Sequence, residues 1–389
     1  MPEVHAKLSA SGAKRWMNCP PSVRLEEGFK DKESPYAKEG TLAHSLAELM
    51  INYNCGRLKK TEFNKQLKEL SKDELYNQEM QEYIEDYVHT VWEFVNEAKA
   101  KCKDIEILTE QRLDFSEYVP DGFGTGDVVI ISDGEIHIID LKYGKGVEVF
   151  ANDNPQLRLY GLGAISTYEM LYDFDKVKMT IMQPRLNNIS SETMPVNFLK
   201  DWGKYTVKPL AELAIKGEGE FKTGDHCQFC KARATCRARA EENLELAKME
   251  FVEPELLKDE EIGDVLRKAD QLVHWVKDIT EYALSEAVNN GKKWDGWKLV
   301  EGRSNRKYTD EIKVAEVLKE AGYDEAVLYE KKLYGITAME KVVGKKKFSE
   351  LLNDLVEKPT GKPTLVPESD KRPEINSTDA AKKDFEKEI

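Results

Sequence analysis

Hydrophobic positions recur with a helical period in the first hundred residues of the chain. Between residues 41 and 54, apolar side chains return every three or four positions, which predicts an amphipathic helix. The stripe consists of Leu42, Leu46, Leu49 and Tyr53, and His44 lies off it. The highly charged stretch 58–103 also predicts helix, in two segments. We interpret that stretch as a helical insertion that caps a sheet.

Short aliphatic runs replace this pattern after residue 104. They predict four strands, at residues 105–108, 128–131, 136–139 and 177–182. Near-continuous aliphatic strands are typical of a sheet that helices cover on both faces. Further helices are predicted at residues 156–167, 237–249 and 259–289. The first of these begins with Asn154 as N-cap and Pro155 at the first helical position. The sequence therefore favours an α/β or α+β core.

The dipeptide Asp133-Gly134 predicts a tight hairpin between the second and third strands. The antiparallel register that such a turn sets places Asp127 directly opposite Asp140. Opposed side chains lie about 4.5–5.5 Å apart at Cβ, and like charges there cost about 0.2–1 kcal/mol unless something neutralises them. A divalent cation such as Mg²⁺ binds carboxylate oxygens and keeps water molecules for chemistry. The hairpin therefore predicts a cation site.

Lys142 follows Asp140 by two positions, so strand alternation returns its side chain to the same face. An ammonium beside two metal-bound carboxylates can orient an attacking water or help to deprotonate it. The simpler interpretation is a surface salt bridge between Lys142 and one of the two aspartates. On the residues alone, both interpretations stay open.

Composition restricts the function classes that the chain can serve. The 389 residues carry a net charge of −14, which argues against a protein that coats nucleic acid through overall positive charge. A local basic groove is still allowed. The mean hydropathy of −0.59 is typical of a soluble protein. No apolar stretch approaches the roughly 20 residues of a membrane helix, and residues 1–7 lack an apolar signal core, so we expect a cytoplasmic location.

Three of the six cysteines are closely spaced: Cys227, Cys230 and Cys236. In a reducing compartment such clusters bind metal more often than they form disulfides. A tetrahedral site needs one more ligand, which Cys19 or His226 could supply. Zn²⁺ is the default ion for Cys and His ligands, whereas four thiolates also suit an iron–sulfur cluster. Cys55 and Cys102 lack partners at useful spacing, and we expect them to be packed thiols.

Four short motifs follow one another between residues 40 and 160. They are Gly40-Thr41-Leu42-Ala43-His44, Gly126-Asp127, Asp140-Leu141-Lys142 and Gln156-Leu157-Arg158-Leu159-Tyr160. This order of Gly-x-x-x-His, Asp, Asp-x-Lys and Gln-x-x-x-Tyr resembles the PD-(D/E)xK nuclease superfamily, specifically its RecB-type exonuclease branch. The resemblance covers about residues 7–239. It implies a restriction-endonuclease-like core, in which a central mixed β-sheet is flanked by helices.

Carried over by position, the resemblance implies a metal site. Asp127 and Asp140 would ligate Mg²⁺ or Mn²⁺, and His44 would help to hold the ion. Glu110, at the end of the first predicted strand, is a weaker candidate for a further acidic ligand. Taken alone, His44 is more readily interpreted as a solvated helix residue.

The resemblance also implies catalytic and positioning roles around that ion. Lys142 would position the nucleophilic water. Gln156 and Tyr160 are four residues apart, so they share one helix face and would line the DNA backbone or brace Lys142. Taken alone, Tyr160 is an ordinary core residue.

A similar arrangement of cysteines occurs in AddB-type nuclease domains and in the CRISPR-adaptation exonucleases with this core. These proteins carry one cysteine before the nuclease motifs and a Cys-x-x-Cys-x(5)-Cys group after them. Cys19, Cys227, Cys230 and Cys236 fit that arrangement. The resemblance implies a [4Fe–4S] cluster that joins the two ends of the nuclease core in a structural role, with Zn²⁺ as the alternative.

We expect four regions along the chain. They are a nuclease core at residues 1–240 with its helical insertion at 58–103, a helical segment at 241–290, a small C-terminal α+β module at 291–355 and a largely disordered tail at 356–389. The last region is rich in proline and charge, as disordered segments are. Residues 296–308 and 362–373 are similar to an uncharacterised family found in phages and prophages.

Basic and aromatic residues combine in the C-terminal module. They are Trp297, Arg303, Arg306, Lys307 and Tyr308. Single-strand-binding surfaces use this combination, although a solvated hairpin is the simpler interpretation. The run Lys345-Lys346-Lys347 is a similarly weak signal, since a short charge run is usually just exposed.

The leading hypothesis is a phage-encoded DNA exonuclease that hydrolyses phosphodiester bonds with Mg²⁺ or Mn²⁺ in replication, recombination or end processing. Its partners would be DNA ends and phage recombination or single-strand-binding proteins. The alternative is a non-catalytic DNA-binding recombination scaffold that keeps the nuclease fold. A third hypothesis is a zinc-stabilised structural phage protein without a DNA role. The presence of Asp127, Asp140 and Lys142 together favours the first, because a degenerate site usually loses one of them.

Overall fold

The computed structural model describes residues 6–29, 35–248, 259–300, 311–320 and 343–352, and the single residues 336, 339, 355 and 356. The chain divides into two compact units, Met1–Ser285 and Glu286–Ile389. Within the described ranges, no helix combines the length and the apolar character that crossing a membrane requires. The first unit contains every motif of the predicted nuclease core.

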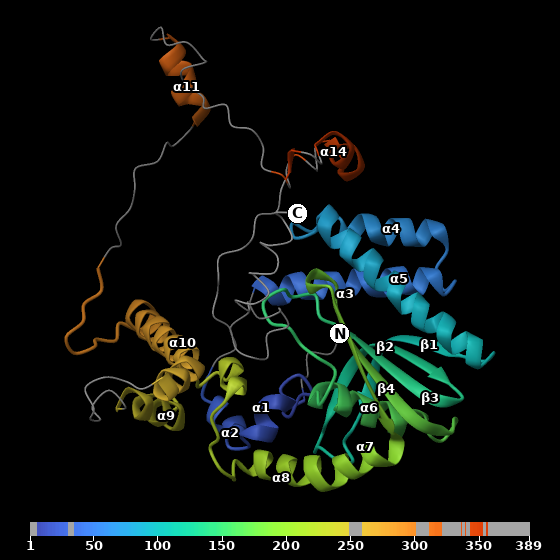
Figure 1. Ribbon diagram of the computed structural model, residues 1–389, viewed down its shortest axis with the longest axis horizontal. Helices are drawn as coiled ribbons and strands as arrows, with labels where there is room; N and C mark the ends of the chain where they lie inside the picture. The colour runs from blue at the N-terminus through green and yellow to red at the C-terminus, as the bar shows by residue number, and fades with distance from the viewer. Residues whose placement is uncertain are drawn as a thin grey trace, which may run out of the picture. The chain divides into compact units, whose positions relative to one another are not determined.

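A five-stranded sheet forms the centre of the first unit (Figure 1). Its strands are β1 (Glu106–Asp114), β2 (Phe123–Ser132), β3 (Gly134–Leu141), β4 (Phe174–Gln183) and β5 (Asn188–Pro195). They lie in chain order, and neighbours are antiparallel except β3 and β4, which are parallel. This mixed sheet between helices confirms the predicted α/β fold. The strand β5 was not predicted, since it is mainly polar and lacks the aliphatic run of the other four.

The hairpin joins β2 and β3 in the predicted register. Val128 pairs with Ile139, and these two residues form the last pair of the ladder. Gly134 in the turn has φ +76°, a conformation that costs glycine little. Asp127 and Asp140 are therefore the next residues on the two strands, at the end of the sheet that the turn does not occupy.

Helices cover both faces of the sheet (Figure 1). One layer contains α3 (Pro35–Asn54), α4 (Lys60–Leu70) and α5 (Gln78–Lys101). The other contains α1 (Ala13–Asn18), α2 (Ser22–Glu26), α6 (Pro155–Tyr168), α7 (Val196–Trp202) and α8 (Lys208–Lys216), with a π-helical segment at Gly203–Val207. Two separate hydrophobic clusters result, one between the sheet and α3 and α5, and one between the sheet and α6. The stretch predicted to form two helices is α4 and α5.

The start of α6 follows from its local sequence. The Asn154 side chain accepts hydrogen bonds from the backbone N–H groups of Gln156 at 3.0 Å and Leu157 at 3.3 Å. Pro155 occupies the first turn, where its missing N–H has no cost. This cap confirms the predicted helix start and places Gln156 at the first turn of α6.

The strand β2 changes face at Asp127. Val128 packs in the cluster under α3 and α5, whereas a Cβ at Gly126 would lie 2.8 Å from Leu113 in the cluster under α6. Residues two apart on a regular strand face the same side, so the strand turns over between these two positions. On β1, Glu110 has φ +49°, in the left-handed region. The backbone is therefore irregular where the two acidic residues lie.

The last helices of the first unit are α9 (Arg237–Lys248) and α10 (Asp259–Asn290), both close to their predicted bounds. Asp278 on α10 accepts hydrogen bonds from Arg233 at 2.8 Å and from Arg239 at 2.5 Å. These two bonds hold α10 against the segment that carries the late cysteines. A short 3₁₀ helix at Asp225–Phe229 contains the first of these cysteines, Cys227.

The described residues of the second unit form the end of α10, α11 (Glu311–Glu320) and α14 (Lys345–Leu352). The basic run that begins at Lys345 is the first turn of α14, and Trp297 is exposed. Arg303, Arg306, Lys307 and Tyr308 lie outside the described residues, as do residues 357–389 of the predicted tail.

Candidate active site and cysteine site

Three possible metal ligands meet where the sheet contacts α3. Their ligand atoms all lie within 4.8 Å of one another, and they belong to His44, Glu110 and Asp127. His44 Nδ1 is 3.1 Å from Asp127 Oδ1. All three residues are half-buried. Two carboxylates and one imidazole nitrogen form a donor set that can hold a divalent cation, and the carboxylates suit Mg²⁺ or Mn²⁺.

Glu110 takes a strained conformation in this group. A non-glycine residue with φ +49° costs of order 1–3 kcal/mol and persists only where its surroundings impose it. It lies in register opposite Asp127, between the paired residues Thr109–Val128 and Gln111–Gly126. Burial and the nearby Asp127 charge raise the pKa of Glu110 to about 7.

The protonation of His44 reflects the same crowding of negative charge. Burial works against its charged form, but the hydrogen bond to Asp127 and the charges of Asp127, Asp140 and Glu110 outweigh burial and raise the pKa of His44. Both shifts favour the uptake of protons, which reduces the negative charge of the group. A divalent ion would supply the same neutralisation.

The site has a second half beside the three possible metal ligands. It contains Asp140, Lys142, Gln156 and Tyr160. Asp140 is buried, and its Oδ2 lies 2.7 Å from Lys142 Nζ. The Gln156 amide Nε2 is 3.4 Å from Asp140 Oδ1 and 3.1 Å from the Tyr160 hydroxyl. Burial and the charge of Asp127 raise the pKa of Asp140, although Lys142 opposes them. Burial and the Asp140 charge raise the pKa of Tyr160, so its hydroxyl is neutral.

A backbone hydrogen bond joins the two halves. The N–H of Leu141 donates to Asp127 Oδ2 at 2.6 Å, so one carboxylate oxygen is held by β3 while the other faces His44. The structure thus brings together the candidate residue or residues of each of the four sequence motifs. It places Glu110, the weaker candidate, in the tight group of ligands. Asp140 is outside that group and contacts Lys142 instead.

Sequence reasoning did not connect Tyr87 with this site. Tyr87 on α5 is buried, and no described residue forms a hydrogen bond with its hydroxyl. Burial raises the pKa of Tyr87, and the charges of Asp127, Asp140 and Glu110 raise it further, which places the hydroxyl near the acidic group. In the sequence it is one apolar position of a helical stripe, which indicates only a core residue.

The four cysteines assigned to a cluster also meet. Cys19, Cys227, Cys230 and Cys236 line one cavity of about 20 Å³, together with His226 and Arg15. All are free thiols. Burial raises the pKa of Cys230 to about 12. His226 Nε2 lies 2.9 Å from the Lys222 carbonyl oxygen, an arrangement that holds the ring and leaves Nδ1 as its possible ligand atom.

The distances between these sulfur atoms can be compared with those in a Zn²⁺ site. Zn–S bonds of about 2.3 Å in a tetrahedron bring sulfurs within about 3.8 Å of one another. Among the described residues, only His44, Glu110 and Asp127 form a group with all ligand atoms within 4.8 Å, so no three of the cysteine sulfurs are that close.

A hydrogen bond holds the N-terminal segment against this cysteine loop, and an ion pair within the segment supports it. Glu26 on α2 accepts a hydrogen bond from the Lys231 N–H at 2.7 Å and pairs with Arg15 at 2.8 Å. The other two cysteines lie elsewhere: Cys55 packs beside the cluster under α3 and α5, and Cys102 Sγ is 3.1 Å from the Asp104 carbonyl oxygen. Neither lines the cysteine cavity.

Fold and site together define an α/β protein with a half-buried carboxylate and imidazole site at one end of a mixed sheet. The family described as "Protein of unknown function (DUF2800)" matches residues 5–373, and the chain belongs to this family. A solved structure titled "Crystal structure of SSO0001" is similar at 15% identity over 61% of this chain and 90% of that chain. Its TM-score of 0.26 is too low to indicate a shared fold.

Proposed function

We propose that this protein is a metal-dependent deoxyribonuclease of the PD-(D/E)xK type that hydrolyses phosphodiester bonds from DNA ends. The observation that carries the proposal is the convergence of His44, Glu110 and Asp127 with the Asp140–Lys142 pair. These residues come from α3, β1, β2 and the end of β3. Of the three acids, Glu110 and Asp127 are half-buried and Asp140 is buried, which is costly for like charges. A cation site explains why the cost is tolerated.

The reaction needs a polarised phosphate and an activated water. Mg²⁺ or Mn²⁺, held by His44, Glu110 and Asp127, would stabilise charge on the phosphate and lower the pKa of a bound water. The water oxygen forms a bond to phosphorus, the bond from phosphorus to the leaving oxygen breaks, and that oxygen takes up a proton.

The chain's own residues supply positioning and charge. Lys142 is partly exposed while its ammonium contacts the buried Asp140, so it can reach both the carboxylate and a substrate phosphate. We assign Lys142 to orient the attacking water. Gln156, which lies within reach of both Asp140 and Tyr160, braces the Asp140 carboxylate from α6. Tyr160 fills the space above Gly124, which fixes the start of α6 against β2.

We further propose that the four-cysteine cavity holds a [4Fe–4S] cluster with a structural role. The four thiols that line one cavity and the hydrogen bond between Glu26 of α2 and the cysteine loop support this assignment. Iron, acid-labile sulfide and zinc measured on protein prepared without oxygen test it. About four iron and four sulfide per chain would support a cluster, and one zinc per chain with no iron would overturn it.

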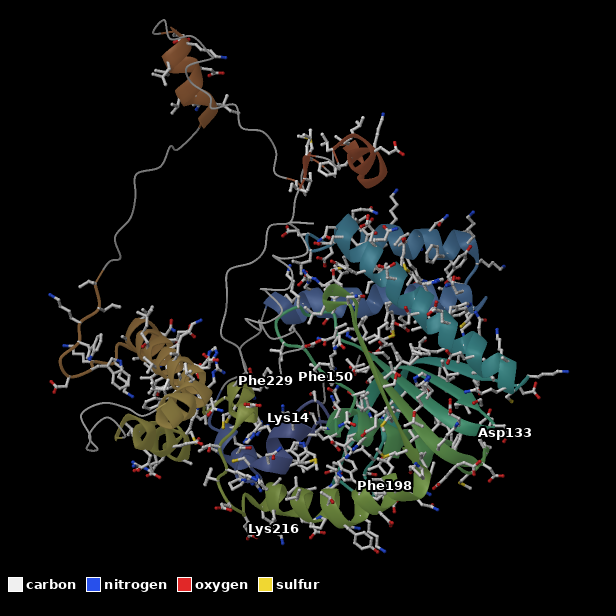
Figure 2. All side chains as sticks on the ribbon, in the orientation of Figure 1. Lys14, Asp133, Phe150, Phe198, Lys216 and Phe229 are labelled. Atoms are coloured by element: carbon white, nitrogen blue, oxygen red, sulfur yellow. The ribbon has the colours of Figure 1, made fainter. Side chains whose placement is uncertain are left out.

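Digestion of end-labelled linear DNA, single- and double-stranded, with Mg²⁺ or Mn²⁺ tests the nuclease proposal. Wild type is compared with Asp140→Asn and with Asp133→Asn as the matched control. Asp133 lies in the turn at the opposite end of the same hairpin (Figure 2). We expect progressive loss of label with wild type and the control, and none with Asp140→Asn.

Inactivity of all three proteins, folded and iron-loaded, would contradict the nuclease proposal. DNA binding without digestion would then favour the non-catalytic scaffold. Titration of DNA binding against salt tests whether such binding is specific to a local basic groove, because those contacts weaken steeply as the salt concentration rises.

A further inference from the structure

The helix α10 directs charged side chains toward the cysteine loop. Asp278 accepts hydrogen bonds from Arg233 and Arg239. Further polar side chains of α10 line a cavity of about 420 Å³ that Cys227 also lines: Asp270, His274, Lys277 and Glu281. A surface helix of a globular protein usually does the reverse, with its apolar stripe toward the core and its charged face toward water. The question is therefore what covers the apolar side of α10.

An apolar stripe runs along α10 and is exposed to solvent. Its large exposed side chains are Ile262, Leu266, Val273, Val276 and Leu284. The stripe contains a seam of eight positions in alternating steps of four and three residues, at 262, 266, 269, 273, 276, 280, 283 and 287. This spacing is the a and d pattern of a coiled coil, and here it extends over more than three heptads, or about 38 Å of helix. A continuous exposed stripe of this kind marks an interaction surface, whereas scattered apolar residues do not.

The side-chain sizes in the seam favour an antiparallel partner of the same sequence. In an antiparallel pair centred between residues 274 and 275, every a position of one helix faces a d position of the other. Leu266 then faces Ala283, and Ile262 faces Ala287, so each large side chain meets a small one. A parallel pair in register would instead place Ala283 on Ala283 and Ala287 on Ala287. Those layers would be underfilled, which close packing disfavours.

The charges beside the seam are complementary in the same arrangement. Asp270 and Lys277 each follow a d position, so they lie along one flank of the seam, and both are exposed. In the antiparallel pair this flank faces the same flank of the second helix. Asp270 of each copy then lies opposite Lys277 of the partner subunit, and the two-fold symmetry forms this ion pair twice. Val273 and Val276 face each other in the central layers between the two pairs.

We propose that α10 pairs with α10 of a second copy of this chain, as an antiparallel two-stranded coiled coil. The protein is then a dimer. Three observations carry the proposal: the exposed seam, the match of large with small side chains, and the complementary flank. Because Asp278 ties α10 to Arg233 and Arg239, which line the cysteine cavity, the paired helices also link the cysteine loops of the two copies. The proposal does not depend on nuclease activity.

Sedimentation velocity of the full-length protein, prepared without oxygen, measures its mass from nanomolar to high micromolar concentration. We expect wild type to reach twice the chain mass of 44.5 kDa. Val273→Lys places two like charges in the central layers and should raise the dissociation constant at least about 100-fold. Val273 is 65% exposed, so the chain's own fold should tolerate the lysine, which circular dichroism checks. The matched control is Val317→Lys, a valine on α11 that is 63% exposed, and it should dimerise like wild type.

A charge exchange tests the antiparallel arrangement. Asp270→Lys or Lys277→Asp alone places like charges opposite each other twice in the dimer. We expect each single variant to raise the dissociation constant about tenfold at low salt. The double variant Asp270→Lys/Lys277→Asp restores opposite charges in both pairs, so its dissociation constant should return to that of wild type.

A wild-type protein that stays monomeric over the whole concentration range would overturn the proposal, since another segment of the chain or a different protein would then cover the stripe. A dimer that Val273→Lys leaves intact, or that Val317→Lys dissociates equally, would also overturn it. A double variant that stays as weak as the single variants would contradict the antiparallel arrangement. None of these measurements uses DNA, so they are independent of the outcome of the digestion assay.

Discussion

The acidic site and the cysteine site are built on different kinds of scaffold. His44, Glu110 and Asp127 stand on a long helix and two paired strands, and their ligand atoms already lie within 4.8 Å of one another. The cysteines stand on short helices and loops, and their sulfurs are more widely spaced. The first site is organised by the fold itself. The second lacks such support, so a group bound there would have to contribute to its structure.

This difference predicts opposite responses to substitution. Residues of the acidic site should matter for activity and little for stability, because crowded like charges destabilise a protein that has no cation bound. Cysteine residues should matter for stability first, because metal binding to such sites is coupled to folding.

Lys142→Met should have the largest effect. We expect a loss of at least about 10²-fold in the rate of DNA digestion, with the melting temperature within a few degrees of wild type. Lys145→Met, three residues along the chain, is the control. Stopped digestion assays and thermal melts check both quantities. Wild-type activity in Lys142→Met would contradict the role of this ammonium.

Cys230→Ala should mainly lower stability. We expect the free energy of unfolding to fall by more than about 3 kcal/mol, because a lost metal group is among the few changes with effects of this size. Cys102→Ala, which lies outside the cavity, should change it by less than about 1 kcal/mol. Chemical denaturation without oxygen gives both values. Equal stability of the two variants would contradict a stabilising role for the cysteine site.

Gly124→Ala tests how the α6 half of the acidic site is positioned. A Cβ at Gly124 would lie 2.4 Å from the Tyr160 ring, so the ring must shift, at a cost of about 1–3 kcal/mol. We expect reduced activity as well, because Tyr160 contacts Gln156. Gly144→Ala has open space around its Cβ and serves as the control. Denaturation and digestion are measured on both variants. If the packing tolerated the added methyl group, Gly124→Ala would match wild type in stability and in activity.

Tyr87→Phe should have the smallest effect. It removes a buried hydroxyl that forms no hydrogen bond with any described residue, so we expect the metal-free protein to gain about 1 kcal/mol of stability. Chemical denaturation in EDTA, and again in Mn²⁺, measures the free energy of unfolding. A loss of stability in EDTA would mean that the hydroxyl has an acceptor when no ion is bound.

Much of this architecture follows from local sequence. Four of the five strands, the turn at Gly134 and the Asn154 cap all depend on interactions between residues close along the chain. Asp127 and Asp140 could be placed at neighbouring strand ends for the same reason, since a two-residue turn sets the register of a whole hairpin.

Other features depended on contacts between distant segments. The sequence determined the strands, the hairpin register and the motif residues, because periodicity and turn chemistry act over a few positions. Only the tertiary structure decided that Glu110 joins His44 and Asp127, that Tyr87 approaches them, and that Cys19 meets a loop some two hundred residues later. The physical reason is that side-chain packing and burial arise between elements, and no local pattern records which elements will meet.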